Sequence, residues 1–306
     1  MKENKVVINI LLIIIIILVV VACVVAYMCI TNNVEIIAPQ LKEPLFTMIN
    51  YPKIDGSTAT LPLAEAFKAD FTETNINDVE IEHSKTHNAY VNLINGKADL
   101  ILVTYPSEDE KKLAEQQGIE LEIVPIVKEA FVFLVNKNNP VENLTLNQIQ
   151  EIYSGKIKNW SVVGGNNNKI LAFQRPENSG SQTGMLELVM KGKKMMQPTT
   201  ETISQSMADI IDVISDYNNT ENAIGYSYYY YATTMYTSDE MKMLSVNGIE
   251  PTYDNIQTGL YDLQTEYYAV IRKSEPEDSN TRKLLKAMMS ERGQNVAKEA
   301  GYVQNY

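Results

Sequence analysis

The chain has 306 residues, of which 45% are apolar and 21% are charged, with 14 glycines and 11 prolines. This balance excludes a disordered, collagen-like or low-complexity chain, and the length suffices for two globular units that each bury a core. The 38 acidic residues outnumber the 26 basic ones, which gives a net charge of −12. Nucleic acid is therefore disfavoured as a partner, because phosphate backbones are bound by basic surfaces. An anionic ligand would have to be held by local groups against the overall charge.

Cysteine and histidine are scarce, and this limits the chemistry of the chain. Both cysteines, Cys23 and Cys29, lie in one apolar N-terminal stretch, so disulfides, cysteine-bound zinc and thiolate nucleophiles are excluded from the remainder. The two histidines, His83 and His87, lack the spacing of a catalytic metal motif. No nucleophile with a partner base is recognisable. The sequence therefore predicts no enzyme, no cofactor and no metal centre, although a site built from oxygen ligands alone stays open.

The apolar stretch predicts attachment to a membrane. Residues 6–30 contain Asn9 as their only strongly polar member, and about 20 apolar residues suffice to span a bilayer. A cleaved signal usually has a shorter apolar region of roughly 7 to 15 residues, which favours an uncleaved signal anchor behind a basic, cytoplasmic N-terminus. The alternative is a lipoprotein signal, because residues 20–23 resemble a lipobox with Cys23 as the lipidated residue. Either reading places the rest of the chain on the extracytoplasmic side of the cell membrane.

The first half of the remaining chain alternates between predicted strands and helices. Residues 31–44 carry two prolines without a clear period, which predicts a short tether. A strand is expected at 46–51, and a helix follows in which Leu63, Phe67 and Phe71 mark the buried face. Three apolar runs predict further strands at residues 98–103, 119–126 and 130–135. This alternation indicates an α/β fold.

The second half continues the alternation. Residues 145–148 fit a capping box, which predicts the start of a helix that ends at Gly155. A strand is expected at 170–173, followed by a polar loop and a helix. The last predicted helix is long and covers roughly residues 279–300.

Two polar loops between a strand and a helix are the strongest functional signal. Gly180 and Ser181 would lie at a helix N-terminus, which carries roughly half a positive charge and unpaired N–H donors, and Arg175 would add a planar fork for two anion oxygens. The loop at 55–60 offers the same small hydroxyl residues before another helix. Two such loops predict an anion site between the halves of the chain. The alternative is two ordinary helix caps and a surface arginine.

At this point the chain resembles a known family. It is similar to the phosphate-binding receptors of bacterial ABC importers, in the type II periplasmic binding-protein superfamily. The resemblance covers almost all of residues 45–306, and the helix, Ser-Gly turn and Asn-Trp segment at 144–165 is its most specific motif. The other matching segments are residues 55–63, 96–99, 175–181, 222–226 and 248–256.

The resemblance implies two α/β lobes joined by a hinge, with the ligand clamped between them. After the anchor or lipoprotein signal at 1–30 and the tether at 31–44, it divides the chain into lobe 1 at 45–135 plus 226–306 and lobe 2 at 136–225. The ligand-binding positions that it implies are Ser57, Thr58, Thr60, Thr86, Arg175, Ser179, Gly180 and Ser181.

Two positions depart from the family's pattern. Thr86 lies in the segment 84–88, which lacks the glycines with which the family wraps an anion. Thr104 stands where phosphate-specific members often have an aspartate that accepts the ligand's proton. Asp55 is the candidate replacement for this acceptor, and the alternative for Asp55 is an Asx turn or a helix cap.

The function implied by the resemblance is capture of a small oxyanion, with phosphate first, for delivery to the permease subunits of an ABC importer. The alternative is a membrane-tethered sensor or cell-surface interaction module that uses the same fold without transport. Neighbouring genes for a permease and an ATPase would favour the importer, and a signalling partner would favour the sensor.

Overall fold

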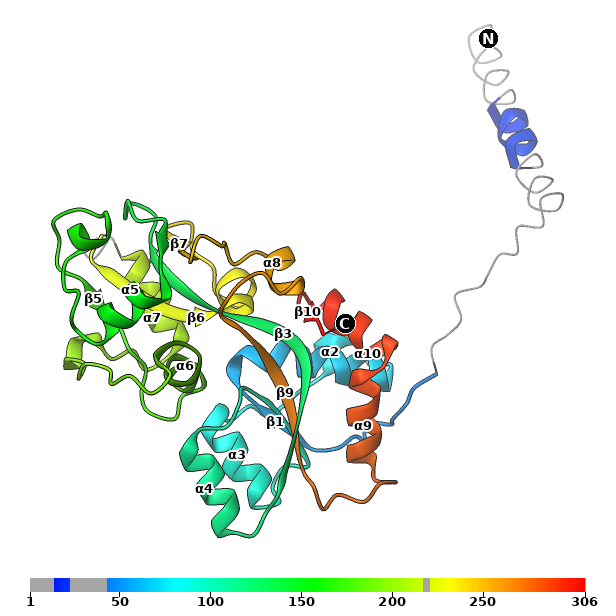
Figure 1. Cartoon of the computed structure of the whole chain (residues 1–306). Coiled ribbons are helices and arrows are strands. Elements are labelled where there is room, and N and C mark those ends of the chain that lie inside the picture. The colour runs from blue at the N-terminus through cyan, green and yellow to red at the C-terminus, as the bar shows by residue number, and fades with distance from the viewer. Residues whose placement is uncertain (1–13, 23–42, 217–220, 306) are drawn as a thin grey trace, which may run out of the picture. The chain divides into compact units, whose positions relative to one another are not determined.

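The N-terminal unit is described over a short stretch only. The computed structural model describes residues 14–22, 43–216 and 221–305, and the chain divides into two units, Met1–Glu43 and Pro44–Tyr306. Residues 14–22 are helical, and their isoleucine, leucine and valine side chains are about half exposed (Figure 1). Among the described residues, no helix combines the length and apolar character needed to cross a membrane. Cys23 and most of the 6–30 stretch lie outside the described residues, so the anchor and the lipoprotein signal both stay predictions.

The first sheet of the second unit is mixed. Strand β1 (Ile54–Gly56) pairs parallel with β2 (Leu100–Val103), which runs antiparallel to β9 (Gln264–Arg272). The first part of β3 (Leu121–Asn136) then pairs antiparallel with β9 and with β10 (Val303–Gln304). The helices that accompany this sheet are α2 (Leu61–Thr72), α3 (Thr86–Ile94), α4 (Glu108–Gln116), α9 (Asn280–Met289) and α10 (Glu291–Glu299), with short 3-10 turns at Thr58–Thr60 and Ile76–Asp78.

The second sheet contains the end of β3, paired antiparallel with β6 (Ala223–Tyr228) and β7 (Met241–Met243), while β5 (Leu171–Ala172) pairs parallel with β6. A separate pair is formed by β4 (Asn143–Leu144) and β8 (Ser245–Val246). The α-helices in this stretch of the chain are α5 (Leu146–Tyr153), α6 (Gly180–Gly184), α7 (Met207–Ser215) and α8 (Tyr253–Gln257). Helix α6 continues into the π-helical segment Met185–Met190, and shorter helical segments are Trp160–Val163, Thr200–Thr202 and Tyr231–Met235.

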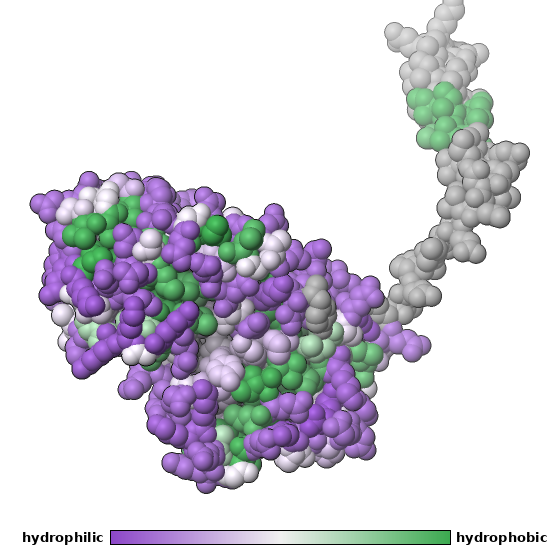
Figure 2. Space-filling view, in the orientation of Figure 1, coloured by the Kyte–Doolittle hydropathy of each residue, from purple (hydrophilic) through white to green (hydrophobic). Residues whose placement is uncertain are grey.

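Strand β3 joins the two sheets. Its pairing passes from β9 at Ala130, opposite Gln264, to β6 at Phe131, opposite Tyr228. Figure 1 shows β3 running from one lobe into the other. The predicted two-lobed α/β fold is therefore confirmed, while the division of the sequence between the lobes stays a prediction. The face in Figure 2 is mostly hydrophilic, as expected for the solvated surface of an acidic protein.

Local sequence signals account for several helices. Leu63, Phe67 and Phe71 are fully buried on one face of α2, and the two phenylalanine rings stack with centroids 5.5 Å apart. Thr145 and Gln148 form the predicted capping box at the start of α5. These confirmed elements are the ones whose burial pattern and caps lie within a dozen residues of sequence.

One predicted strand and two predicted element boundaries were wrong. Residues 46–51 form a turn instead of a strand, because Thr47 and Asn50 each accept the other's backbone N–H (2.7 and 3.3 Å). The two strands expected at 119–126 and 130–135 are the single strand β3, with a register shift between Pro125 and Val127.

The single long helix expected at residues 279–300 is instead two helices, α9 and α10. Ser290 has an extended backbone (φ −72°, ψ 165°) between α9 and α10, and its side chain caps α10 by accepting from the N–H of Gly293 (3.2 Å). A Cβ at position 293 would lie 2.3 Å from the carbonyl oxygen of Ala287. Glycine is therefore needed where the two helices meet, and the apolar period alone did not show this break.

Candidate functional site

The first wall of the site is the loop between β1 and α2. Ser57 caps the helical turn at Thr58–Thr60, and its N–H donates to the carbonyl oxygen of Leu102 (3.0 Å). Thr60 is fully buried, and its hydroxyl donates to the same carbonyl oxygen (2.5 Å). Ser57 and Thr58 line the central cavity of the unit, whereas Thr60 is not among its lining residues and holds the loop from behind.

The second segment on this wall is the start of α3. Lys85, Thr86, His87 and Asn88 line the cavity, and Thr104 lines it from the end of β2. Within the described residues, the buried Thr104 hydroxyl has no hydrogen-bond partner. Buried polar groups are nearly always satisfied, so a polar ligand atom is the expected partner of this hydroxyl.

Asp55 lies behind these loops and does not line the cavity. Its Oδ1 accepts from the N–H groups of Gly56 and Ser84 (both 2.7 Å), and its Oδ2 accepts from the Ser84 hydroxyl (2.6 Å) and Asn92 (2.8 Å). The two bonds from Ser84 tie the β1 loop to the segment before α3, and the bond from Asn92 ties it to α3 itself. Asp55 is therefore neither an Asx turn nor the helix cap, which is Ser57, but a side chain that cross-links two loops, while its role as a proton acceptor for the ligand stays a prediction.

The opposite wall carries Arg175 and the loop before α6. The guanidinium donates to the carbonyl oxygens of Ser204 (2.9 Å) and Gln205 (3.2 Å) and to the Ser181 hydroxyl (3.2 Å). Three of its five N–H donors are thus used, which leaves two for a ligand. Burial lowers the pKa of Arg175 from its ordinary value, but a guanidinium stays protonated near neutral pH.

Arg175 differs from the other three arginines of the chain. The other three form ion pairs with carboxylates. Arg272 pairs with Glu275 (2.5 Å), Arg282 with Glu122 (2.9 Å) and Arg292 with Asp70 (2.5 Å). Across the described ranges, no carboxylate pairs with Arg175, whose three partners are neutral. Its charge is therefore available to an anion in the cavity.

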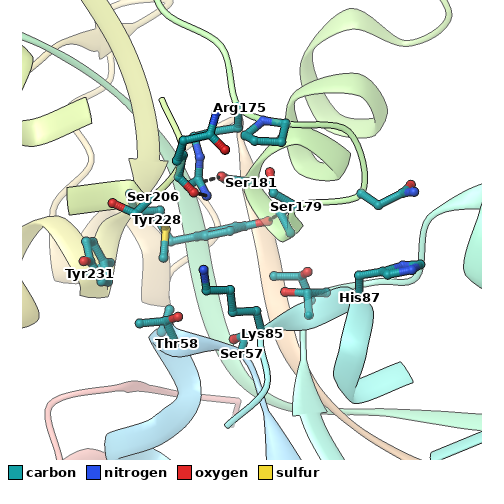
Figure 3. Close-up of a pocket in the computed structure, with 18 of the residues that line it drawn as sticks. Ser57, Thr58, Lys85, His87, Arg175, Ser179, Ser181, Ser206, Tyr228 and Tyr231 are labelled. Atoms are coloured by element: carbon teal, nitrogen blue, oxygen red, sulfur yellow. Dashed lines mark hydrogen bonds between the residues drawn. The ribbon is translucent and has the colours of Figure 1, made fainter. Parts of the chain in front are cut away.

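Four helix starts meet at this cavity, which has a volume of about 370 Å³. They are the 3-10 turn that leads into α2, then α3, α6 and α7, whose first residues Thr58, Thr86, Gly180 and Met207 all line it. Each start presents unpaired N–H groups and a partial positive charge. Figure 3 shows Arg175, Ser179 and Ser181 facing Ser57, Thr58 and Lys85 across the gap.

The two walls approach each other closely at Gly180. A Cβ there would lie 2.7 Å from the hydroxyl oxygens of both Thr86 and Thr104, so only glycine fits this position. Nearby, Asn178 donates to the carboxylate of Asp109 on α4 (3.0 Å). The Tyr228 hydroxyl donates to the Gly180 carbonyl oxygen (2.9 Å). The bond between Asn178 and Asp109 links the two walls, whereas Tyr228 and Gly180 both belong to the part of the chain around the second sheet.

Sequence reasoning overlooked several lining residues. Lys85 was noticed only as part of a segment without glycines, and the start of α7 at Ser206 and Met207 was not considered. Tyr230 stacks on Tyr302 with ring centroids 3.6 Å apart, whereas Tyr228 and Tyr231 line the cavity. The serine cap before α7 was the signal that could have revealed the fourth helix start.

No cluster of three or more histidine, cysteine, aspartate or glutamate side chains that could hold a metal ion is present in the described residues. His87 lines the cavity and pairs with the buried Glu110 (Nδ1 to Oε1, 3.1 Å). This pair fixes the imidazole on the wall beside Thr86.

A two-lobed α/β unit with helix starts converging on a cavity between two walls has the architecture of the periplasmic binding-protein fold. The chain belongs to the PBP superfamily domain family, whose model matches residues 49–291.

Among similar proteins, the phosphate-binding protein PstS of Staphylococcus saprophyticus is 29% identical over 82% of this chain and 79% of its own length. The PstS of Bacillus subtilis is 27% identical over 69% of this chain and 66% of its own length, just under two thirds. A candidate phosphate ABC transporter substrate-binding protein of Clostridium perfringens, solved with bound phosphate, is 28% identical, with a TM-score of 0.67 over 84% of this chain and all of that one.

Proposed function

We propose that this chain binds phosphate between its lobes and delivers it to the permease subunits of an ABC importer. The observation that carries the proposal is that four helix starts converge on one cavity together with Arg175, which pairs with no carboxylate among the described residues. The similarity to phosphate-binding proteins supports this ligand. The chain would act by binding alone, not as an enzyme.

The residues proposed to hold the anion come from both walls. Arg175 supplies charge, the N–H groups at Gly180 and Ser181 supply the dipole of a helix start, and hydroxyls supply further donors. The proposed hydroxyl ligands are Ser57, Thr58, Thr86, Ser179 and Ser181, all of which line the cavity. Thr60 would contribute by holding the first loop.

Titration of the full-length, detergent-solubilised chain with inorganic phosphate tests the proposal. A ligand that binds only the folded state stabilises it by about 2.7 kcal/mol at one hundred times its Kd. We therefore expect saturable heat in calorimetry and a rise in melting temperature that grows with phosphate concentration. Equal concentrations of sodium chloride control for ionic strength. The proposal is contradicted if phosphate produces no saturable heat and no rise in melting temperature.

We further propose that residues 6–30 anchor the chain, so that the binding unit lies on the extracytoplasmic side of the membrane. The apolar run continues past Cys23, whereas a mature lipoprotein normally turns polar after its lipidated cysteine. The run is also long enough to span a bilayer. Replacing Cys23 by serine is therefore expected to leave the chain in the membrane fraction, with no change in apparent mass beyond the substitution itself. Release of Cys23→Ser into the medium, or loss of a lipid mass in mass spectrometry, would support lipidation instead.

A further inference from the structure

Lys85 has a backbone conformation that lysine rarely adopts. Its φ of 70° and ψ of 163° fall in a region populated almost only by glycine. Such residues persist only where the surroundings hold them, and they cluster at binding sites. Here Asp55 holds the preceding residue, because its carboxylate accepts from both the N–H and the hydroxyl of Ser84. The segment thus takes the conformation that glycine would favour, although a lysine stands there.

The side chain of Lys85 reaches into the cavity. Figure 3 shows it extending from the wall that carries Ser57 and Thr58 toward the wall that carries Arg175. Within residues 43–216 and 221–305, its ammonium group has no hydrogen-bond or ion-pair partner. The only carboxylate among the described lining residues is that of Glu177, which is exposed. Lys85 and Arg175 therefore face one cavity from opposite walls, and neither forms an ion pair among the described residues, although the Asp209 carboxylate acts on Arg175 from the first turn of α7.

We infer that Lys85 is the second cationic ligand of the site and that, with Arg175, it selects doubly charged tetrahedral oxyanions by charge. The inference rests on the proposed function and makes its ligand class more specific. A dianion gains about twice as much from each cation as a monoanion does. Rejection of sulfate would need a buried carboxylate that accepts the proton of phosphate and repels an anion without one. Since no buried carboxylate is among the described lining residues, sulfate is expected to compete with phosphate.

Four variants of the full-length chain separate the charge of Lys85 from its backbone strain. Lys85→Met removes the charge and should weaken binding of both inorganic phosphate and sulfate by about tenfold or more, the effect of losing one charge-assisted hydrogen bond. Lys85→Gly should lose the same affinity but melt at a higher temperature, because the strain is relieved. Lys85→Arg should retain most of the affinity. Lys97→Met removes an exposed lysine outside the cavity and should bind both anions like the wild type.

Calorimetric titration with phosphate, and with sulfate as competitor, gives the readout. The inference is supported if the wild type binds sulfate with an affinity within about tenfold of that for phosphate, and if Lys85→Met binds both anions about tenfold or more weakly than the wild type. It is overturned if Lys85→Met, melting like the wild type, binds both anions with wild-type affinity. It is also overturned if the wild type binds phosphate tightly while excess sulfate fails to compete, although the proposed function then stands. If the wild type binds neither anion, the proposed function itself fails.

Discussion

Replacing Arg175 by alanine is expected to weaken phosphate binding by about a hundredfold or more. The two N–H donors left on the guanidinium can each form a charge-assisted hydrogen bond, worth about 1.5 to 3 kcal/mol. The substitution also removes the bonds that hold Ser181 and the carbonyl oxygens of Ser204 and Gln205 in place. Calorimetric titration of the wild type and of Arg175→Ala with phosphate measures the change.

Two further variants make this result specific. Arg175→Lys keeps the charge but loses the planar fork, so it should recover only part of the affinity. Arg292→Lys is the matched control, because Arg292 pairs with Asp70 and does not line the cavity. It should bind phosphate like the wild type. An Arg175→Ala protein that melts normally and keeps wild-type affinity would remove Arg175 from the site.

The two anion loops could be predicted because their signals are local. A helix start needs a small polar cap and a following apolar period, and both lie within a few residues at Ser57 and at Ser179. Arg175 stood out for a similar reason, since it is one of four arginines and lies beside a Ser-Gly-Ser turn. These residues are brought together on opposite walls of one cavity, as the two loops suggested.

The remaining features depend on contacts between distant parts of the chain. Asp55 was a candidate acceptor until its bonds to Ser84 and Asn92, 29 and 37 residues away, were known. Lys85 could not be recognised, because nothing in its own segment shows that the backbone takes up a positive φ. The order of strands in the two sheets is likewise set by pairings that no local pattern encodes.

Glu129 is a buried carboxylate that no sequence pattern indicated. It lies on β3 next to Ala130, where pairing passes from β9 to β6, and it is 1% exposed. Its Oε1 accepts from the N–H groups of Ala130 (2.7 Å) and Tyr230 (3.3 Å), while its Oε2 has no hydrogen-bond partner within the described residues. Burial raises the pKa of Glu129 to about 7, and these N–H donors only partly offset that effect.

This raised pKa has a definite consequence for stability. Between about pH 4.5, the ordinary value, and pH 7 the folded chain keeps a proton that the unfolded chain has lost. The contribution of Glu129 is therefore fully present below about pH 4.5 and is lost as the pH rises through 7. Above that pH the folded chain carries a buried carboxylate, which costs on the order of 3 kcal/mol.

Glu129→Gln should therefore stabilise the chain in alkaline solution. Glutamine keeps the oxygen that accepts from Ala130 and Tyr230 but never ionises, so the variant is expected to match the wild type near pH 4.5 and to exceed it by about 1 to 3 kcal/mol near pH 8. Urea unfolding at a series of pH values measures both proteins. Glu115→Gln, on an exposed position of α4, should follow the wild-type profile. Equal free energies of unfolding for Glu129→Gln and the wild type at every pH would show that the Glu129 carboxyl ionises in the folded chain as it does in water.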